Sequence, residues 1–168
     1  DHPSEGSASR PPGTDARADR RSGSVAGVER PSSPDARESF DRSATVYDDH
    51  VAFNREGARR LVASVPEGTY PRLLDVACGT GFAALAAIPR LGVEHVIGVD
   101  ASAAMVGVFR ERLAAHPGVT ADLRVCDVMR TEVPDGTVDL ALCAMALHWF
   151  EERAAAVALM GRTLAPGG

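Results

Sequence analysis

The 168-residue sequence is poor in several features, and each shortage excludes a class of protein. No apolar run approaches the roughly 20 residues that a membrane-spanning helix needs, and the first residues lack the apolar core of a signal peptide. The three cysteines form no C-x-x-C pair, so neither a disulfide framework nor a metal framework is expected. We therefore expect a cytoplasmic protein with reduced core thiols and no membrane partner.

Lysine is absent from the sequence, and the formal net charge is −5. We attribute the exclusive use of arginine to genomic composition rather than to function. A net negative chain is unlike the basic domains that bind nucleic acids, so no nucleic-acid partner is expected. The five histidines show no metal-ligand spacing, and no metal is predicted.

Large apolar side chains are scarce in residues 1–38, where Val25 and Val28 are the largest and no aromatic residue occurs. Pro, Gly, Ser, Arg and Asp dominate this segment. Such a segment cannot bury enough surface to offset the entropy lost on ordering. It is predicted to be a disordered tail, followed by one domain over residues 39–168.

Helical and strand patterns alternate along the remainder of the chain. Apolar residues at helical spacing predict helices, short apolar runs predict strands, and Pro and Gly mark their ends. The alternation indicates an α/β domain with a doubly wound, mostly parallel sheet, of which the first four strands are clear. The predicted helices cover residues 40–47, 51–65, 82–90, a segment from Ser102 to Pro117, and 151–164; the strands cover 72–77, 93–99, 119–126 and 138–144.

A glycine-rich turn joins the first predicted strand to the helix that follows it. Residues 73–81 read Leu-Leu-Asp-Val-Ala-Cys-Gly-Thr-Gly. Gly79 and Gly81 allow a sharp turn and let a ligand approach main-chain N–H groups at the helix N-terminus. Because many helices pack on their strands through a similar turn, the motif alone leaves a nucleotide site and a structural turn open.

Acidic residues stand at the carboxyl ends of the first three predicted strands, namely Asp75, Asp100 and Asp127. Ligands of doubly wound sheets bind beyond this edge. A carboxylate at the end of the second strand can accept hydrogen bonds from both hydroxyls of a ribose. Each acid alone could be a turn former or a helix cap, but three acids and two glycines at corresponding strand ends predict a nucleoside-cofactor site.

Four segments, in order, carry a family resemblance: Leu73–Gly81, Gly98–Ser102, Cys126–Val128 and Leu164–Gly168. The chain resembles the class I S-adenosylmethionine-dependent methyltransferases, and more narrowly the small-molecule enzymes of the type 11 or UbiE-like kind. The resemblance covers about residues 40–168 and implies a Rossmann-like methyltransferase domain with S-adenosylmethionine as its cofactor. Ala77 departs from the family pattern, which often has glycine at this position.

The resemblance also implies a role for each matched residue. The implied cofactor-binding residues are Asp75, Gly79 and Gly81 at the methionyl end, Ala77 in the same segment, Asp100 at the ribose hydroxyls, Ala101 and Met105 against the adenine, Asp127 and Val128 at the adenine amino edge, Ala144 beneath the sulfonium, and Tyr47 closing over the cofactor.

The residues after the fourth strand bear on the methyl acceptor. Residues 143–147 read Cys-Ala-Met-Ala-Leu, unlike the Asn- or Asp-Pro-Pro-aromatic motif of many enzymes that methylate DNA bases or protein amides. The resemblance therefore implies methyl transfer to the oxygen or carbon of a small molecule. An acceptor that must lose a proton needs a base, and His148 is the candidate, with a structural role as the alternative. Trp149 and Phe150 are expected to pack locally, with stacking on a substrate as the alternative.

The family fold continues beyond the Pro-Gly-Gly turn, so a chain ending at Gly168 is interpreted as a fragment or as the cofactor-binding half of a longer enzyme. The fourth strand would then be an apolar sheet edge that invites self-association. Two other functions stay open. One is a cofactor-binding module without turnover, and the other is a nicotinamide-dependent oxidoreductase, because Gly79-x-Gly81-x-x-Ala84 also fits the dinucleotide fingerprint.

Overall fold

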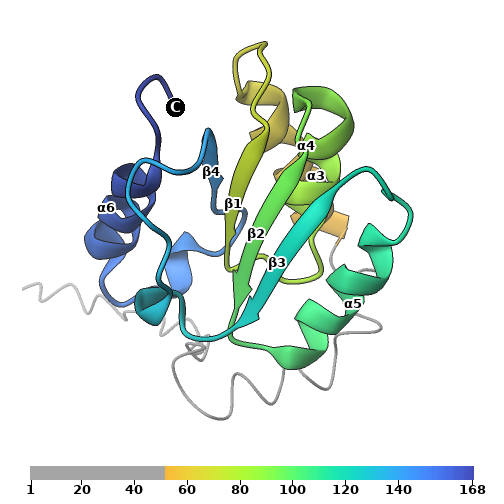
Figure 1. Ribbon diagram of the computed structural model, residues 1–168. Coiled ribbons are helices and arrows are strands. Elements are labelled where there is room, and N and C mark those ends of the chain that lie inside the picture. The colour runs from red at the N-terminus through yellow and green to blue at the C-terminus, as the bar shows by residue number, and fades with distance from the viewer. Residues whose placement is uncertain (1–51) are drawn as a thin grey trace, which may run out of the picture.

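The computed structural model describes residues 52–168. The tail predicted over 1–38, the helix predicted over 40–47 and Tyr47 lie outside the described residues. Figure 1 shows a central sheet with helices on both of its faces. The elements are α3 (Ala52–Ser64), β1 (Arg72–Val76), α4 (Phe82–Leu91), β2 (His95–Asp100), α5 (Ala103–Leu113), β3 (Thr120–Val125), the 3-10 turn η1 (Val128–Arg130), β4 (Leu140–Leu142), the 3-10 turn η2 (Leu147–Trp149) and α6 (Arg153–Thr163).

The four strands are parallel and lie in the order β3-β2-β1-β4. Asp75 of β1 is in register with Gly98 of β2 on one side and with Leu142 of β4 on the other. The order reverses between β1 and β4, which is the topological switch point of the sheet. Ligands of such folds bind beyond the carboxyl ends of the strands at this point.

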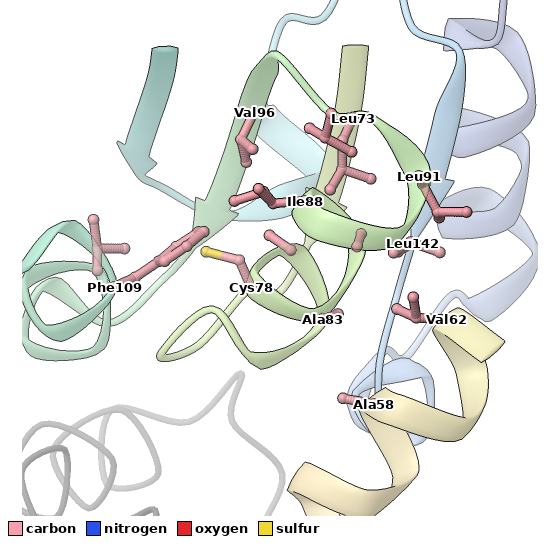
Figure 2. Packing of buried hydrophobic residues seen from close by; sticks show 14 residues of the cluster. Ala58, Val62, Leu73, Cys78, Ala83, Ile88, Leu91, Val96, Phe109 and Leu142 are labelled. Atoms are coloured by element: carbon pink, nitrogen blue, oxygen red, sulfur yellow. The ribbon is translucent and has the colours of Figure 1, made fainter. Parts of the chain in front are cut away.

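Two apolar clusters pack on opposite faces of the sheet, because successive side chains of β1 point to opposite sides. Leu73 faces α3, α4 and α5, whereas Leu74 and Val76 face α6. Figure 2 shows the first cluster, with Phe109 and Cys78 lying against each other beside β2. Its buried members on the helices are Ala58, Val62, Ala83, Ala84, Ala87, Ile88, Leu91, Val106 and Phe109.

Residues at the helix ends explain where two of the helices begin or end. The Ser102 hydroxyl accepts a hydrogen bond from the Met105 N–H at 3.2 Å, which caps α5 as the sequence predicts. Gly92 follows α4 with a φ of 62°, a left-handed conformation that glycine adopts readily. None of the helices in the described part of the chain has the length and apolarity to cross a membrane.

The fourth strand is shorter than the sequence predicts. It was expected over 138–144 but covers only Leu140–Leu142. Before it, Val138 forms an isolated bridge to Leu164, and Asp139 accepts hydrogen bonds from the backbone N–H and guanidinium of Arg72. After it, Met145 has a φ of 56°, which ends the extended conformation. In the described sheet β4 is an edge strand.

Candidate functional site

A cavity of about 480 Å³ opens at the carboxyl ends of the strands, next to the switch point. Its volume lies in the range of small-molecule binding sites, roughly 300–1,000 Å³. The lining comes from α3, the β1–α4 turn, the ends of β2 and β3, and the segment after β4. The lining residues are Asn54, Ala58, Asp75, Ala77, Cys78, Gly79, Thr80, Phe82, Ala83, Asp100, Ala101, Ser102, Met105, Asp127, Val128, Met129, Ala144, Met145, Ala146, Trp149, Phe150, Glu151 and Glu152.

The β1–α4 turn is built from residues with a positive φ. Ala77, Gly79 and Gly81 have φ values of 54°, 52° and 87°. A side chain built on Gly79 would meet no atom within 4 Å, so this backbone faces open space in the cavity wall. A side chain on Gly81 would instead overlap with the ring of Phe109. The first glycine leaves room for a ligand, and the second lets α5 pack against the turn.

The two non-glycine residues with positive φ in the described chain, Ala77 and Met145, both line the cavity. Such conformations cost an L-residue roughly 1–2 kcal/mol, and they cluster at functional sites. Met145 lies under α3, where a side chain on Gly57 would come within 2.7 Å of the Met145 sulfur. Glycine at position 57 therefore lets α3 approach the segment after β4.

Backbone N–H groups hold the Asp100 carboxylate in a fixed orientation. Gly79 donates to Oδ2 at 2.8 Å, and Ser102 donates to Oδ1 at 2.9 Å. A carboxylate offers about four acceptor positions, so one bond to each oxygen orients the group. Asp100 thus joins the β1–α4 turn to the end of β2 at the cavity wall.

Asp75 is the buried acid of the site, with 1% of its surface exposed. Its Oδ2 accepts a hydrogen bond from the Ala84 N–H in the first turn of α4 at 3.2 Å. Burial raises the pKa of Asp75 to about 7; the Ala84 bond opposes this rise, and the charge of Asp100 adds to it. Among residues 52–168, no protein donor is paired with Oδ1.

Two thiols lie close to this acid. Burial is the main cause that raises the pKa of Cys78 well above its usual value, and the nearby carboxylates of Asp75 and Asp100 add to the effect. Burial and the charge of Asp75 raise the pKa of Cys143 to about 12. Because the thiolate is the reactive form, both thiols are unreactive near neutral pH.

The structure brings together nine of the residues predicted for the cofactor site: Asp75, Ala77, Gly79, Asp100, Ala101, Met105, Asp127, Val128 and Ala144 all line the cavity. Gly81 does not, and its packing against Phe109 accounts for the glycine there. His148 also lies outside the lining; it is exposed, and its ring lies beside that of Trp149, tilted by 35° with 4.9 Å between centroids. Tyr47 falls outside the described residues.

Sequence reasoning missed several lining residues. Trp149 and Phe150 were expected to pack locally, and Phe150 does join the α6-facing cluster, yet both line the cavity. Asn54 and Ala58 come from α3, and their spacing of one helical turn was the available signal. The guanidinium groups of Arg55 and Arg112 each lie over the ring of Phe82, at 5.1 and 5.2 Å from its centroid.

None of the described residues form a cluster of three or more His, Cys, Asp or Glu side chains suited to a metal ion.

Comparison with known proteins places this geometry in a family. The methyltransferase domain family matches residues 73–168. A malonyl-[acyl-carrier protein] O-methyltransferase of Dechloromonas aromatica is 34% identical over 140 residues, which cover 83% of this chain and 50% of that protein. A trans-aconitate 2-methyltransferase of an Azoarcus species is 32% identical over 111 residues, which cover 66% of this chain and 42% of that protein.

A solved protein structure is also similar to this chain in fold. The YcgJ protein of Bacillus subtilis superposes with a TM-score of 0.57 at 26% identity, covering 66% of this chain and 46% of that chain. The present chain spans about half the length of the curated relatives it matches. The matched family, the strand order and the glycine-rich turn agree, and the chain belongs to the class I S-adenosylmethionine-dependent methyltransferases.

Proposed function

We propose that the protein binds S-adenosylmethionine in the cavity at the carboxyl ends of the strands and transfers its methyl group to the oxygen or carbon of a small molecule. The observation that carries the proposal is the Asp100 carboxylate. It ends β2 at the cavity wall and is oriented by the N–H groups of Gly79 and Ser102. A carboxylate in this position suits the two hydroxyls of a ribose.

The residues present fit such a cofactor on two further grounds. The open space beside Gly79 allows a ligand to lie against the backbone of the turn. The buried Oδ1 of Asp75 has no donor among residues 52–168, and a ligand with a positively charged amine would supply one. Both features belong to the methionyl end of the proposed site.

For the other predicted site residues, we propose the roles that the family resemblance implies. Asp75, Ala77 and Gly79 would hold the methionyl end, Ala101 and Met105 would pack against the adenine, and Asp127 and Val128 would meet its amino edge. Ala144 would lie beneath the sulfonium, and Tyr47 would close the site. Gly81 would shape the turn without touching the ligand.

The bound cofactor supplies an electrophilic methyl group, and the protein's own contribution is to orient it toward the acceptor and to exclude water. A carboxylate acceptor needs no base, whereas a hydroxyl or carbon acceptor does. The described lining contains the carboxylates of Asp127, Glu151 and Glu152 but no histidine. The relatives' names specify malonyl-carrier-protein and trans-aconitate acceptors, so we propose small acids or their thioesters as the first acceptors to assay.

Calorimetric titration tests the cofactor assignment. We expect wild-type protein to bind S-adenosylmethionine and S-adenosylhomocysteine with micromolar Kd, and Asp100→Ala to lose this binding while keeping its fold. Asp135→Asn is the matched control, because Asp135 lies in an exposed turn paired with Arg162. Binding of NADH with equal or higher affinity would favour the oxidoreductase, and cofactor binding without methyl transfer would favour a binding module.

We also propose a cytoplasmic location and self-association through the edge strand β4. Sedimentation at several protein concentrations tests the second proposal. A monomer at all concentrations would contradict it.

A further inference from the structure

We propose that Asp75 selects for positively charged ligands and that it releases its proton when such a ligand binds. The inference rests on the proposed function, because it concerns the same cavity and the proposed cofactor. It adds to that function a dependence of ligand affinity on pH and on ligand charge.

The first observation is the environment of the carboxyl group. Asp75 is 1% exposed and lines the cavity. Within the described chain, its carboxyl group accepts one hydrogen bond, from the Ala84 N–H. A buried carboxylate is costly unless donors or a cation compensate it. One backbone donor at the N-terminus of α4 compensates it only in part, so the free protein favours the protonated acid below neutral pH.

The charges around Asp75 favour the same state. From β2, Asp100 contributes a second carboxylate. The thiols of Cys78, in the turn, and Cys143, after β4, supply no compensating positive charge, and neither ionises near neutral pH. Three more acidic residues, Asp127, Glu151 and Glu152, line the cavity, and the residues that α3 contributes, Asn54 and Ala58, are uncharged.

No arginine or histidine of residues 52–168 lines the cavity. The guanidinium groups of Arg55 and Arg112 lie over the ring of Phe82. The described wall therefore offers Asp75 no positively charged partner. A ligand that brings an ammonium or sulfonium group would favour the ionised carboxylate, and its binding would displace the proton.

The sign of the pH effect follows from this linkage. A cationic ligand binds more tightly as pH rises toward neutrality, because fewer molecules must lose a proton first. With the pKa of Asp75 at about 7 in the free protein and its carboxylate ionised in the complex, affinity rises roughly eightfold from pH 6.0 to 7.5. A neutral ligand that fills only the nucleoside part of the site shows no such rise.

Calorimetry tests the inference with S-adenosylmethionine as the cationic probe and adenosine as the neutral one. Titrations at pH 6.0 in two buffers with different ionisation enthalpies report proton release directly. We expect roughly 0.9 proton released per S-adenosylmethionine bound, and close to none with adenosine. This measurement needs no variant, so the inference can be contradicted even where a substitution unfolds the chain.

The variant Asp75→Asn keeps the shape of the side chain and removes its titration. We expect it to lose both the proton release and the eightfold pH effect, whereas the control Asp135→Asn keeps both. Binding with pH-independent affinity and no buffer-dependent heat would overturn the inference and leave the proposed function standing. No binding by folded wild-type protein at any pH would overturn the proposed function and this inference with it.

Discussion

Substitution of the two glycines of the β1–α4 turn, Gly81 and Gly79, should lower stability by different amounts. Replacing Gly81 with alanine places a side chain at a φ of 87° and into the ring of Phe109, which is fully buried. The left-handed conformation costs an L-residue roughly 1–2 kcal/mol, and overpacking a core costs roughly 1–3 kcal/mol. We expect Gly81→Ala to lower the free energy of unfolding by about 2–5 kcal/mol.

Gly79→Ala is the matched variant. Its φ of 52° carries the conformational cost, but its side chain meets no atom within 4 Å. We expect a loss of stability limited to about 1–2 kcal/mol. Because the new methyl group projects from the cavity wall, we also expect cofactor affinity to fall at least tenfold.

Urea denaturation of both variants, followed by circular dichroism, measures the stabilities, and calorimetry measures the affinities. The double variant Gly81→Ala/Phe109→Ala separates the clash from the conformational strain. If overlap with the Phe109 ring causes the loss of stability, the effects of the two substitutions on the free energy of unfolding are non-additive, because Phe109→Ala removes the atoms that the new side chain overlaps. Additive losses, or a Gly79→Ala protein less stable than Gly81→Ala, would refute the assignment of the two glycines.

Three further predictions concern the same region. Because the pKa of Asp75 is raised in the folded protein, its contribution to folding stability is present below pH 4 and is lost as pH rises through about 7. Relative to Asp75→Asn, the wild type should therefore lose about 4 kcal/mol of unfolding free energy between pH 4 and 8. A pH-independent difference between the two proteins in urea denaturation would contradict this. Ser102→Ala removes the cap of α5 and should cost about 1 kcal/mol, measured the same way, with Ser102→Asp as the variant that restores it. Ala77→Gly relieves a φ of 54° and should cost no stability despite the greater freedom of glycine in the unfolded chain. A clear loss of thermal stability would show that the methyl group of Ala77 contributes more than the strain.

Local patterns along the chain were enough to predict the order of helices and parallel strands. The Ser102 cap is a local signal that the structure bears out. The end of the same helix is not, because α5 ends at Leu113, before the Pro117 boundary that the sequence predicts. The length of β4 was overestimated because its limits depend on distant partners. Arg72 holds Asp139 before the strand, and the pairing with β1 covers only Leu140–Leu142.

The position of the candidate site was also predictable, since acids at the carboxyl ends of parallel strands must share one edge. The finer geometry was not. The glycine at position 81 is required by Phe109, a residue of α5 that the turn meets only in the folded chain. A 3-10 turn directs His148 out of the cavity while Trp149, the next residue, lines it. Neither fact has a signal in the local sequence.

A crystal structure of the chain with S-adenosylhomocysteine would test the central claim most directly. The account predicts the nucleoside in the cavity, with both ribose hydroxyls within hydrogen-bonding distance of the Asp100 carboxylate and the methionyl amine beside Asp75. A ligand bound elsewhere, or a ribose in the cavity that makes no contact with Asp100, would contradict it.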